Sequence, residues 1–207
     1  GQRCGANQVV LEMEGSARSL LTAERTLLNF LQLLSAVATR TADYVAAVQG
    51  VPGNRAQIVD TRKTLPGLRL AQKYAVRAGG GTNHRIGLYD AVLIKENHIA
   101  AAGGVAAAIK AAQALNSGVD IQVEVENMTE LAEAIEAGAK SILIDNFTTD
   151  QMREAVAFTA GRALLEASGG IDLDQMRAIA ATGVDRISLG KLTKDIHAVD
   201  FSMRIQG

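Results

Sequence analysis

The apolar and polar positions follow a repeating order along most of the chain. A short apolar run comes first, then a polar loop, and then a longer amphipathic segment. Six short runs rich in β-branched and aliphatic residues predict strands, at residues 57–60, 91–94, 121–126, 141–145, 163–166 and 186–189. Amphipathic segments between them predict helices, at residues 68–78, 104–115, 129–137, 149–158 and 172–181. From residue 121 onward the strand runs start 20, 22 and 23 positions apart, a spacing typical of βα units.

The strand runs are apolar on both faces, as expected for a parallel sheet that is covered on both sides. Gly138 and Gly183 follow two of the predicted helices, where glycine commonly adopts a left-handed conformation. We therefore predict the α/β class and an incomplete, open parallel α/β barrel of six to seven strands, since a standard barrel has eight. Residues 199–205 would form the seventh strand, returning to the sheet at the amino end of the chain.

The amino-terminal part follows a different pattern. Residues 8–14 mix apolar and acidic positions before a Gly-Ser turn, and they predict a strand whose partners come from another chain or from a segment preceding residue 1. A long helix is expected next, with Thr22 as its N-cap. Its predicted buried stripe is Leu27, Leu31, Leu34, Ala38, Val45 and Val48. Arg25 would lie in the first turn, where the helix dipole disfavours a cation, so it is either held by an anion or is an ordinary surface arginine.

Composition narrows the classes of function. The 207 residues are 48% hydrophobic and 21% charged, as expected for a soluble globular protein with a large core. The formal net charge of −1 gives no broad positive field for nucleic acid, and no apolar run is long enough to span a membrane. Cys4 is the one cysteine, which excludes a disulfide within this chain and a thiolate metal cluster. We therefore expect a cytoplasmic protein that binds neither nucleic acid nor membrane.

Candidate chemistry is concentrated where the predicted strands end, since ligands of parallel α/β barrels bind beyond the carboxyl ends of the strands. The residues at these positions are Arg62, Lys63, Lys95, Glu124, Asp145, Ser168, Gly169 and Gly190. A glycine-rich segment, residues 79–85, lies between the first two strands and ends in His84 and Arg85. Charged, hydroxylated and glycine residues at six successive strand ends are hard to explain as solvent-exposed loops alone.

Five of these residues form a cationic group suited to carboxylates or phosphates: Arg62, Lys63, His84, Arg85 and Lys95. Considered alone, the basic segment 60–67 is at least as typical of an ordinary solvent-exposed turn, closed by its Pro-Gly dipeptide. The functional interpretation therefore depends on the combination of the strand ends.

The remaining residues suit a sugar phosphate. Glu124 and Asp145 place two carboxylates on neighbouring strands, where they could bind Mg²⁺ through water or hold ribose hydroxyls. Ser168, Gly169 and Gly190 expose backbone N–H groups that suit a terminal phosphate. The pattern predicts a sugar-phosphate ligand together with a second acidic substrate. No spacing matches a Ser/His/Asp triad, a zinc site, a Walker loop or a dinucleotide fingerprint.

Eight segments resemble quinolinate phosphoribosyltransferase, also called carboxylating nicotinate-nucleotide pyrophosphorylase. They are residues 22–29 (TAERTLLN), 60–69 (DTRKTLPGLR), 79–85 (GGGTNHR), 93–98 (LIKENH), 123–127 (VEVEN), 145–147 (DNF), 166–170 (EASGG) and 188–193 (SLGKLT). They occur in the order of the family, and the segment from residue 60 is highly specific. The resemblance implies phosphoribosyl transfer from 5-phosphoribosyl 1-pyrophosphate to quinolinate with decarboxylation, giving nicotinate mononucleotide, pyrophosphate and CO₂ in NAD biosynthesis, with Mg²⁺ as cofactor.

The resemblance also implies a role for each matching residue. The residues implied to bind quinolinate are Arg62, His84, Arg85, Lys95 and, from the partner subunit of a homodimer or higher homo-oligomer, Arg25. The residues implied to be catalytic are Lys63, Glu124 and Asp145, which would also bind 5-phosphoribosyl 1-pyrophosphate together with Ser168, Gly169 and Gly190. Glu124 and Asp145 would in addition bind Mg²⁺, through water.

The family resemblance implies three parts of the chain: residues 1–34 as the remnant of a smaller α/β sandwich domain, 35–197 as the α/β-barrel phosphoribosyltransferase domain, and 198–207 as a segment returning to the amino-terminal domain. About eighty further residues are expected before residue 1 in family members. Two alternatives stay open. One is a phosphoribosyltransferase of the same fold that acts on nicotinate or another ring, and the other is a non-catalytic barrel that binds a sugar phosphate.

Overall fold

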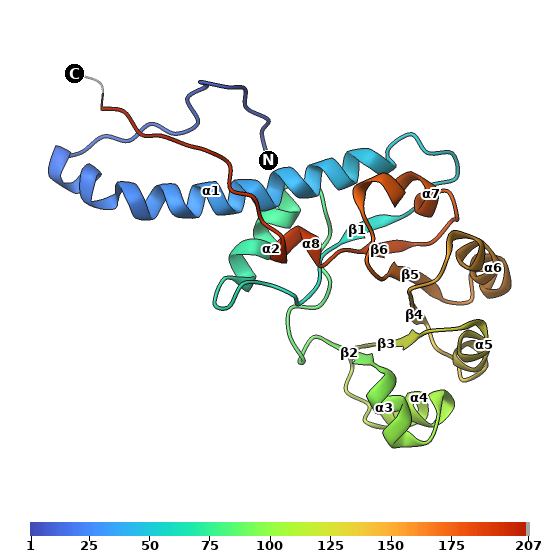
Figure 1. Cartoon of the computed structure of the whole chain (residues 1–207). Coiled ribbons are helices and arrows are strands. Elements are labelled where there is room, and N and C mark those ends of the chain that lie inside the picture. Colours follow the sequence, from blue (N-terminus) through green and yellow to red (C-terminus); the bar gives the residue numbers. More distant parts are fainter. Residues whose placement is uncertain (206–207) are drawn as a thin grey trace.

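Six parallel strands form one open sheet in the computed structural model, which describes residues 1–205 (Figure 1). The strands are β1 (Gln57–Val59), β2 (Ala91–Ile94), β3 (Asp120–Val125), β4 (Ser141–Asp145), β5 (Leu164–Ser168) and β6 (Arg186–Ser188). Their order is β1-β6-β5-β4-β3-β2, and every pair of neighbours is parallel. Because β1 and β2 are the two edges, the sheet does not close, and the predicted open parallel barrel is confirmed.

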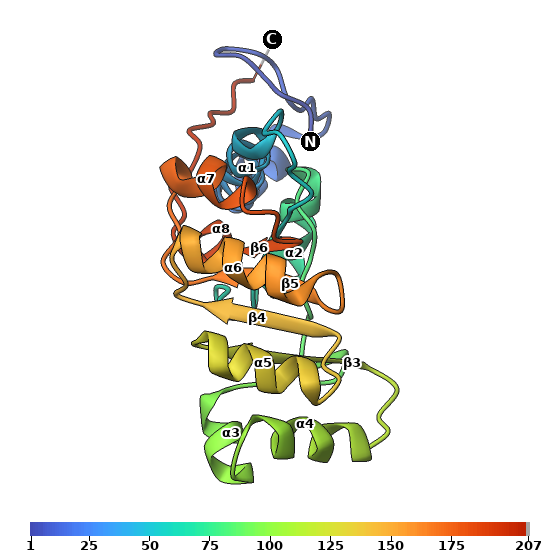
Figure 2. The ribbon, with the colours of Figure 1, turned by 90° about the vertical axis from the view of Figure 1, so that its right-hand side faces the viewer.

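Helices connect the strands. They are α2 (Arg69–Ala78), α3 (Glu96–Ala102), α4 (Val105–Ala114), α5 (Met128–Glu136), α6 (Thr149–Thr159), α7 (Met176–Ala180), preceded by the 3-10 turn η1 (Leu173–Gln175), and α8 (Lys191–Lys194). Figure 2 shows α5, α6 and α7 stacked along the outer face of the sheet. The sequence pattern does not predict α3 or α8, because both are too short to show an amphipathic repeat.

The core lies between the sheet and its outer helices. The alternate strand residues that face the helices are fully buried, among them Ile142, Ile144, Leu165 and Ile187. This burial on the helix side explains the apolar residues of the strand runs. The alternate positions on the inner side include polar residues such as Gln122 and Glu166, so the expectation of runs that are apolar on both faces does not hold for the inner face. The left-handed glycine caps are confirmed, since Gly138 has φ 82° and Gly183 has φ 90°.

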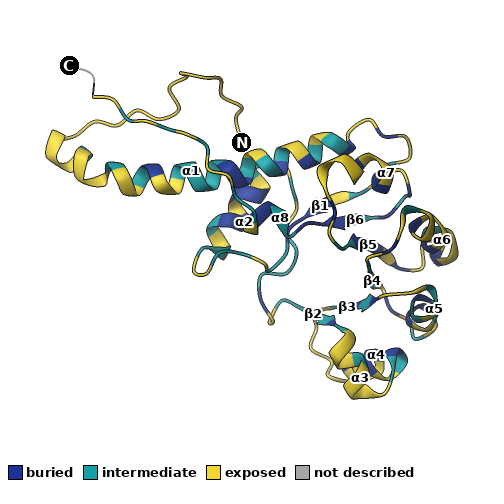
Figure 3. Cartoon of the chain, in the orientation of Figure 1, coloured by how far each residue is buried: buried dark blue, intermediate teal, exposed yellow. Residues whose placement is uncertain are grey.

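Helix α1 (Ala17–Val48) differs from the prediction at its start. Its N-cap is Ser16, whose Oγ accepts a hydrogen bond from the Ser19 N–H, whereas the Thr22 hydroxyl donates to the carbonyl of Arg18 inside the helix. Arg25 is therefore an interior helix residue, and the argument from the helix dipole at the first turn was wrong. The amino-terminal half of α1 extends away from the sheet and is mostly exposed, while the other half packs against α2 (Figures 1 and 3).

The buried side of α1 is also shifted from the predicted stripe. The buried residues are Leu28, Ala36, Val37, Thr41, Tyr44 and Val48. Of the predicted positions, Val48 is buried and the others are intermediate, although Leu34, Ala38 and Val45 pack against the core. The buried side of α1 thus includes a threonine and a tyrosine, which an apolar stripe does not detect.

Two predicted strands are wrong. Residues 8–14 and 199–205 form no strand, because neither segment has a neighbouring strand to which its backbone could hydrogen-bond. The second segment instead runs beside α1, where the Val199 N–H donates to the Gln32 carbonyl and the Gln32 amide donates to the Phe201 carbonyl. Residues 206–207 of the predicted carboxyl-terminal segment lie outside the described residues. Within residues 1–205, no helix combines the length and the apolar character needed to cross a membrane.

Candidate active site

The parallel sheet brings most of the predicted site residues to the end of the sheet where the strands terminate. Because all six strands point the same way, the residues at their carboxyl ends gather at the same end of the barrel. Arg62 and Lys63 follow β1, Lys95 follows β2, and Gly190 follows β6. Asp145 and Ser168 face each other across the last register position shared by β4 and β5.

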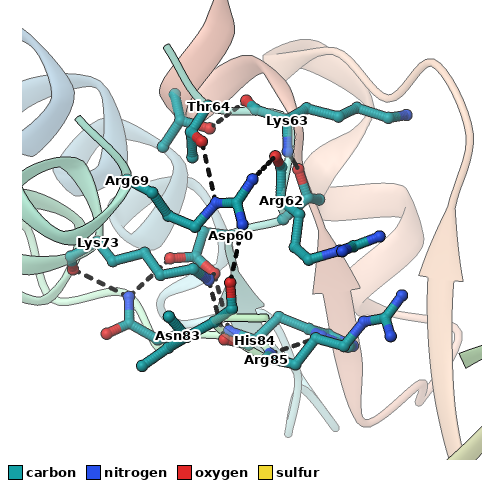
Figure 4. Close-up of polar contacts among 12 residues, drawn as sticks. Asp60, Arg62, Lys63, Thr64, Arg69, Lys73, Asn83, His84 and Arg85 are labelled. Atoms are coloured by element: carbon teal, nitrogen blue, oxygen red, sulfur yellow. Dashed lines mark hydrogen bonds and ion pairs between the residues drawn. The ribbon is translucent and has the colours of Figure 1, made fainter. Parts of the chain in front are cut away.

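A buried carboxylate joins the two cationic loops. Asp60, which is 0% exposed, accepts hydrogen bonds from Lys73 Nζ at 2.5 Å, Asn83 Nδ2 at 2.6 Å and the His84 N–H at 2.8 Å (Figure 4). Lys73 is 3% exposed, and its Nζ also donates to the His84 carbonyl at 2.9 Å. Burial raises the pKa of Asp60, although the charge and hydrogen bond of Lys73 oppose that shift. This ion pair therefore attaches the segment before Arg85 to the end of β1.

The two arginines of the cationic group come close together as a result. Figure 4 shows the side chains of Arg62 and Arg85 directed to the same side of the Asp60 network. Burial, and then the neighbouring positive charge of Arg62, lowers the pKa of Arg85 below its usual value. Two adjacent guanidinium groups suit a ligand with more than one negative group.

Arg69 strengthens the same arrangement. Its guanidinium donates to Thr64 Oγ1 at 3.2 Å, to the Ile86 carbonyl at 3.0 Å and to the Arg62 carbonyl at 3.2 Å. Sequence reasoning missed the supporting roles of Arg69 and Lys73, which lie one turn apart on α2. The signal that could have found Lys73 is its place beside Gln72 and Val76 on the buried face of that helix.

Lys95, another member of the cationic group, pairs with Glu124, a carboxylate that is predicted to be catalytic. Lys95 Nζ lies 2.9 Å from Glu124 Oε2, with the Lys95 side chain 44% exposed and that of Glu124 12% exposed. The structure therefore brings together one residue predicted to bind quinolinate and one predicted to bind the ribose. A ligand carboxylate at Lys95 would compete with Glu124 for the same ammonium group.

Glycine is required where β4 and β5 end. Gly169 has φ 104°, and a Cβ placed on it would lie 2.2 Å from Asn146 Oδ1. Asn146 is itself in the left-handed conformation at φ 57°, and its Nδ2 donates to Asp145 Oδ2 at 2.7 Å. The glycine thus lets the Asp145-Asn146 turn approach the Ser168-Gly169 backbone.

A second close approach lies where β6 and β1 end. A Cβ on Gly190 would lie 3.0 Å from Lys63 Cδ, so the lysine side chain passes over the glycine backbone. Thr193 Oγ1 donates to the Lys63 carbonyl at 2.8 Å, which attaches α8 to the same loop. Lys63, predicted to be catalytic, is therefore positioned beside the predicted phosphate-binding backbone.

His84 is held inside the barrel rather than at its open end. Its Nε2 lies 3.0 Å from Gln122 Oε1 and 3.4 Å from Glu166 Oε2. A cavity of about 630 Å³ lies beside it, lined by His84, Arg85 and Gln122 and by the first residues of five strands, Ala91, Asp120, Ser141, Leu164 and Arg186. The cavity therefore opens toward the amino ends of the strands, away from the edge where Glu124 and Asp145 lie.

Two family descriptions match the chain. The model described as "Quinolinate phosphoribosyl transferase, C-terminal domain" matches residues 37–204, and the N-terminal domain model matches residues 1–35. The chain belongs to the quinolinate phosphoribosyltransferase family. This assignment agrees with the open parallel sheet, and it identifies the chain as a member of a family of pentosyltransferase enzymes.

Curated proteins of this family are similar over nearly the whole chain. A probable carboxylating nicotinate-nucleotide pyrophosphorylase of Bacillus subtilis is 47% identical over 206 residues, which is 99% of this chain and 70% of the relative. The Mycobacterium leprae enzyme is 44% identical over 98% of this chain and 72% of its own length. The solved nicotinate-nucleotide pyrophosphorylase of Francisella tularensis has a TM-score of 0.88 and 52% identity, and covers 92% of this chain and 67% of that structure.

One residue predicted from the family resemblance lies apart from the others. Arg25 is exposed on the half of α1 that extends away from the sheet, so the site at the strand ends of the same chain does not include it (Figure 1). This position is compatible with its predicted contribution to the site of another subunit. The residues that the structure gathers at the carboxyl ends of the strands are Arg62, Lys63, Lys95, Glu124, Asp145, Ser168, Gly169 and Gly190. Arg85 precedes β2, and its guanidinium donates to the carbonyl of Ala91, the first residue of that strand, at 3.1 Å.

Proposed function

We propose that this chain transfers the phosphoribosyl group of 5-phosphoribosyl 1-pyrophosphate to the ring nitrogen of quinolinate, with loss of CO₂. The products are nicotinate mononucleotide and pyrophosphate, which makes the reaction a step of NAD biosynthesis. The proposal is supported by the names of the family members and by one feature of the structure. That feature is the meeting of Arg62, Lys63 and Lys95 with two carboxylates at the carboxyl ends of the parallel strands, with Arg85 near Arg62.

Arg62, Arg85 and Lys95 are proposed to bind the two carboxylates of quinolinate. The adjacent guanidinium groups of Arg62 and Arg85 favour a dianion over a monoanion, because each carboxylate can pair with its own planar donor. Lys95 is 2.9 Å from Glu124, so it lies next to the proposed ribose site and could hold quinolinate beside the sugar. Such an arrangement would place the ring nitrogen near the reacting carbon.

Glu124 and Asp145 are proposed to hold the ribose hydroxyls. The backbone N–H groups of Ser168, Gly169 and Gly190 would hold the 5-phosphate, since neither glycine has a side chain of its own that keeps a ligand from its backbone. Lys63, which passes over Gly190, would bind the pyrophosphate. These roles divide the strand ends between the acidic ring and the sugar phosphate.

The proposed chemistry begins at the anomeric carbon. The bond from this carbon to pyrophosphate breaks as the quinolinate nitrogen attacks, and positive charge that develops on the ribose ring is stabilised by Glu124 and Asp145. The attacking nitrogen carries no proton, so no general base is required. The C–CO₂ bond next to that nitrogen then breaks, its electron pair is stabilised by the positive nitrogen, and the ring carbon takes up a proton.

Mg²⁺ is the proposed cofactor, and the residues present suit it in part. Within residues 1–205 no three carboxylate, histidine or cysteine side chains gather closely enough to hold an ion by themselves. Mg²⁺ is commonly bound by one or two carboxylates together with waters and substrate phosphates, which Glu124 and Asp145 could provide with the pyrophosphate of the substrate. When bound, the ion would neutralise charge on the departing pyrophosphate.

A homodimer or higher homo-oligomer with shared active sites is also proposed, in the cytoplasm. Two observations support a partner subunit near the site. Arg25 lies exposed on α1, and large apolar side chains are exposed on α2 and in the loop before β2, namely Leu70, Tyr74, Leu88 and Tyr89. A covering subunit would bury this apolar surface beside the segment that includes Arg85.

The test is an assay of pyrophosphate and CO₂ release with 5-phosphoribosyl 1-pyrophosphate, Mg²⁺ and either quinolinate or nicotinate. Equal amounts of pyrophosphate and CO₂ with quinolinate, and neither with nicotinate, are expected. Pyrophosphate release with nicotinate would support the alternative phosphoribosyltransferase. Binding of the sugar phosphate without release of pyrophosphate in either arm would support a non-catalytic barrel.

A further inference from the structure

The His84 ring is hydrogen-bonded at both nitrogens. The Arg85 backbone N–H donates to His84 Nδ1 at 2.8 Å, so Nδ1 must present a lone pair and no proton. Nε2 lies 3.0 Å from Gln122 Oε1 and 3.4 Å from Glu166 Oε2. Whether Nε2 bears a proton therefore depends on which atoms of Gln122 and Glu166 face it.

Glu166 decides the orientation of Gln122. Glu166 is 1% exposed, and its Oε2 accepts from Gln122 Nε2 at 3.0 Å. Burial raises the pKa of Glu166, but the hydrogen bond and charge of His84 and the hydrogen bond of Gln122 outweigh burial and hold it below its usual value. An ionised carboxylate only accepts, so the Gln122 amide nitrogen must face Glu166 and its oxygen must face His84. Both groups near Nε2 are then acceptors, and Nε2 must bear the ring proton.

We infer that Glu166 and Gln122 are positioning residues that fix the proton of His84 on Nε2, so that Nδ1 holds the Arg85 backbone in place. His84 then has no free ring nitrogen to bind a substrate carboxylate, and its contribution to quinolinate binding is through Arg85. This inference rests on the proposed function and changes the role that the family resemblance implies for His84. Glu166 and Gln122 come from β5 and β3, so side chains of two strands help to fix the position of the loop.

A second ring proton would disrupt this arrangement. It would have to bind Nδ1, where it would face the Arg85 N–H. Burial and the charge of Arg186 lower the pKa of His84, but the hydrogen bond and charge of Glu166 raise it overall. The other charged groups around this segment are the Arg85 side chain, Asp60, which accepts from the His84 N–H, and Lys73, which donates to the His84 carbonyl. Acidification through the raised pKa of His84 should therefore release Arg85 and weaken quinolinate binding.

Two matched variants separate the positioning role from direct binding. In His84→Asn the side-chain oxygen can replace Nδ1 as the acceptor for the Arg85 N–H, whereas in His84→Gln the amide reaches the position of Nε2. The inference predicts that His84→Asn binds quinolinate more tightly than His84→Gln in equilibrium titrations. Tighter binding by His84→Gln would overturn the inference, because it would show that a polar group at the Nε2 position, and not the acceptor for the Arg85 N–H, determines quinolinate binding.

A spectroscopic measurement tests the proton position without turnover. The chain has three histidines, so ¹⁵N-histidine labelling gives few signals to assign. At pH 8, His84 should show a protonated Nε2 and an unprotonated Nδ1, and Glu166→Gln should shift the ring toward a mixture of both forms. In the same variant the KM for quinolinate should rise about tenfold or more, with the KM for 5-phosphoribosyl 1-pyrophosphate unchanged.

Wild-type protein with Nδ1 protonated at pH 8, or a Glu166→Gln variant with unchanged ring signals, would contradict the inference. If Glu166→Gln fails to fold, the titrations of His84→Asn and His84→Gln provide the second test, since both variants leave Glu166 unchanged. Failure of the proposed function gives a different result. In that case the wild-type protein releases no pyrophosphate with quinolinate, while its histidine signals still report the proton position.

Discussion

The Asp60–Lys73 pair offers the sharpest prediction for stability. In Asp60→Asn the buried Lys73 ammonium, 3% exposed, would lose the carboxylate that lies 2.5 Å from it. The variant would also place an amide N–H₂ where three donors, from Lys73, Asn83 and His84, now find acceptor oxygens. Removing one partner of a buried ion pair costs about 3–5 kcal/mol, a large share of a total stability of roughly 5–15 kcal/mol. We therefore expect a large fall in the free energy of unfolding.

Urea denaturation of the wild type and three variants measures this effect. Asp150→Asn is the matched control, because Asp150 also lies 2.5 Å from its partner, Arg153, but both side chains are exposed, at 91% and 52%. The control should unfold at nearly the wild-type urea concentration, since exposed ion pairs contribute little. The double variant Asp60→Asn with Lys73→Met should be more stable than Asp60→Asn alone, because it no longer buries an unpaired charge.

Two outcomes would refute this reasoning. In one, Asp60→Asn destabilises the protein no more than Asp150→Asn does, so that burial adds nothing to the pair. In the other, the double variant is less stable than Asp60→Asn, so that the unpaired lysine is not the source of the cost. The m-value should be compared in each case, because a changed slope would indicate a changed native or unfolded state rather than a changed stability.

Three further predictions concern the site and its pH dependence. Glu124→Gln should lower kcat about 100-fold with little loss of quinolinate affinity, because it weakens stabilisation of the ribose cation while freeing Lys95; steady-state kinetics with unchanged kcat would contradict this. Gly169→Ala should raise the KM for 5-phosphoribosyl 1-pyrophosphate but not for quinolinate, since a Cβ would lie 2.2 Å from Asn146 Oδ1; an equal rise for both substrates would argue against a phosphate role. Glu166 has a pKa lowered from 4.5, although burial opposes the shift, so its stabilising effect is present above that value and is lost as pH falls through the folded-state pKa. The difference in unfolding free energy between wild type and Glu166→Gln should therefore shrink on acidification, and a difference that grows would contradict the assignment.

Sequence alone predicts most of the sheet, for a physical reason. The face of a parallel strand that helices cover is apolar, so runs such as residues 141–145, with Ile142 and Ile144 buried, are recognisable without knowledge of their neighbours. The segment at residues 8–14 has a similar local pattern but no pairing strand, and pairing cannot be deduced from a local pattern. Short helices such as α8 depend on local caps and packing, which an amphipathic repeat does not reveal.

The site could be predicted as far as strand topology determines it. Parallel strands place all their carboxyl ends at one edge, so Lys95, Glu124 and Asp145 could be grouped before any distance was known. The contacts that hold the site could not be predicted in this way. Gln122 and Glu166 are 44 positions apart, and their side chains come within 3.0 Å because β3 and β5 flank β4 in the sheet.

The most direct measurement of the central claim is a calorimetric titration with phthalate and benzoate, which differ by one carboxylate. If Arg62, Arg85 and Lys95 form one site for a dicarboxylate, the wild-type protein should bind phthalate and bind benzoate weakly or not at all. Arg85→Gln should lose most of the affinity for phthalate. Equal affinities for phthalate and benzoate, or an Arg85→Gln variant that binds phthalate as the wild type does, would contradict the account.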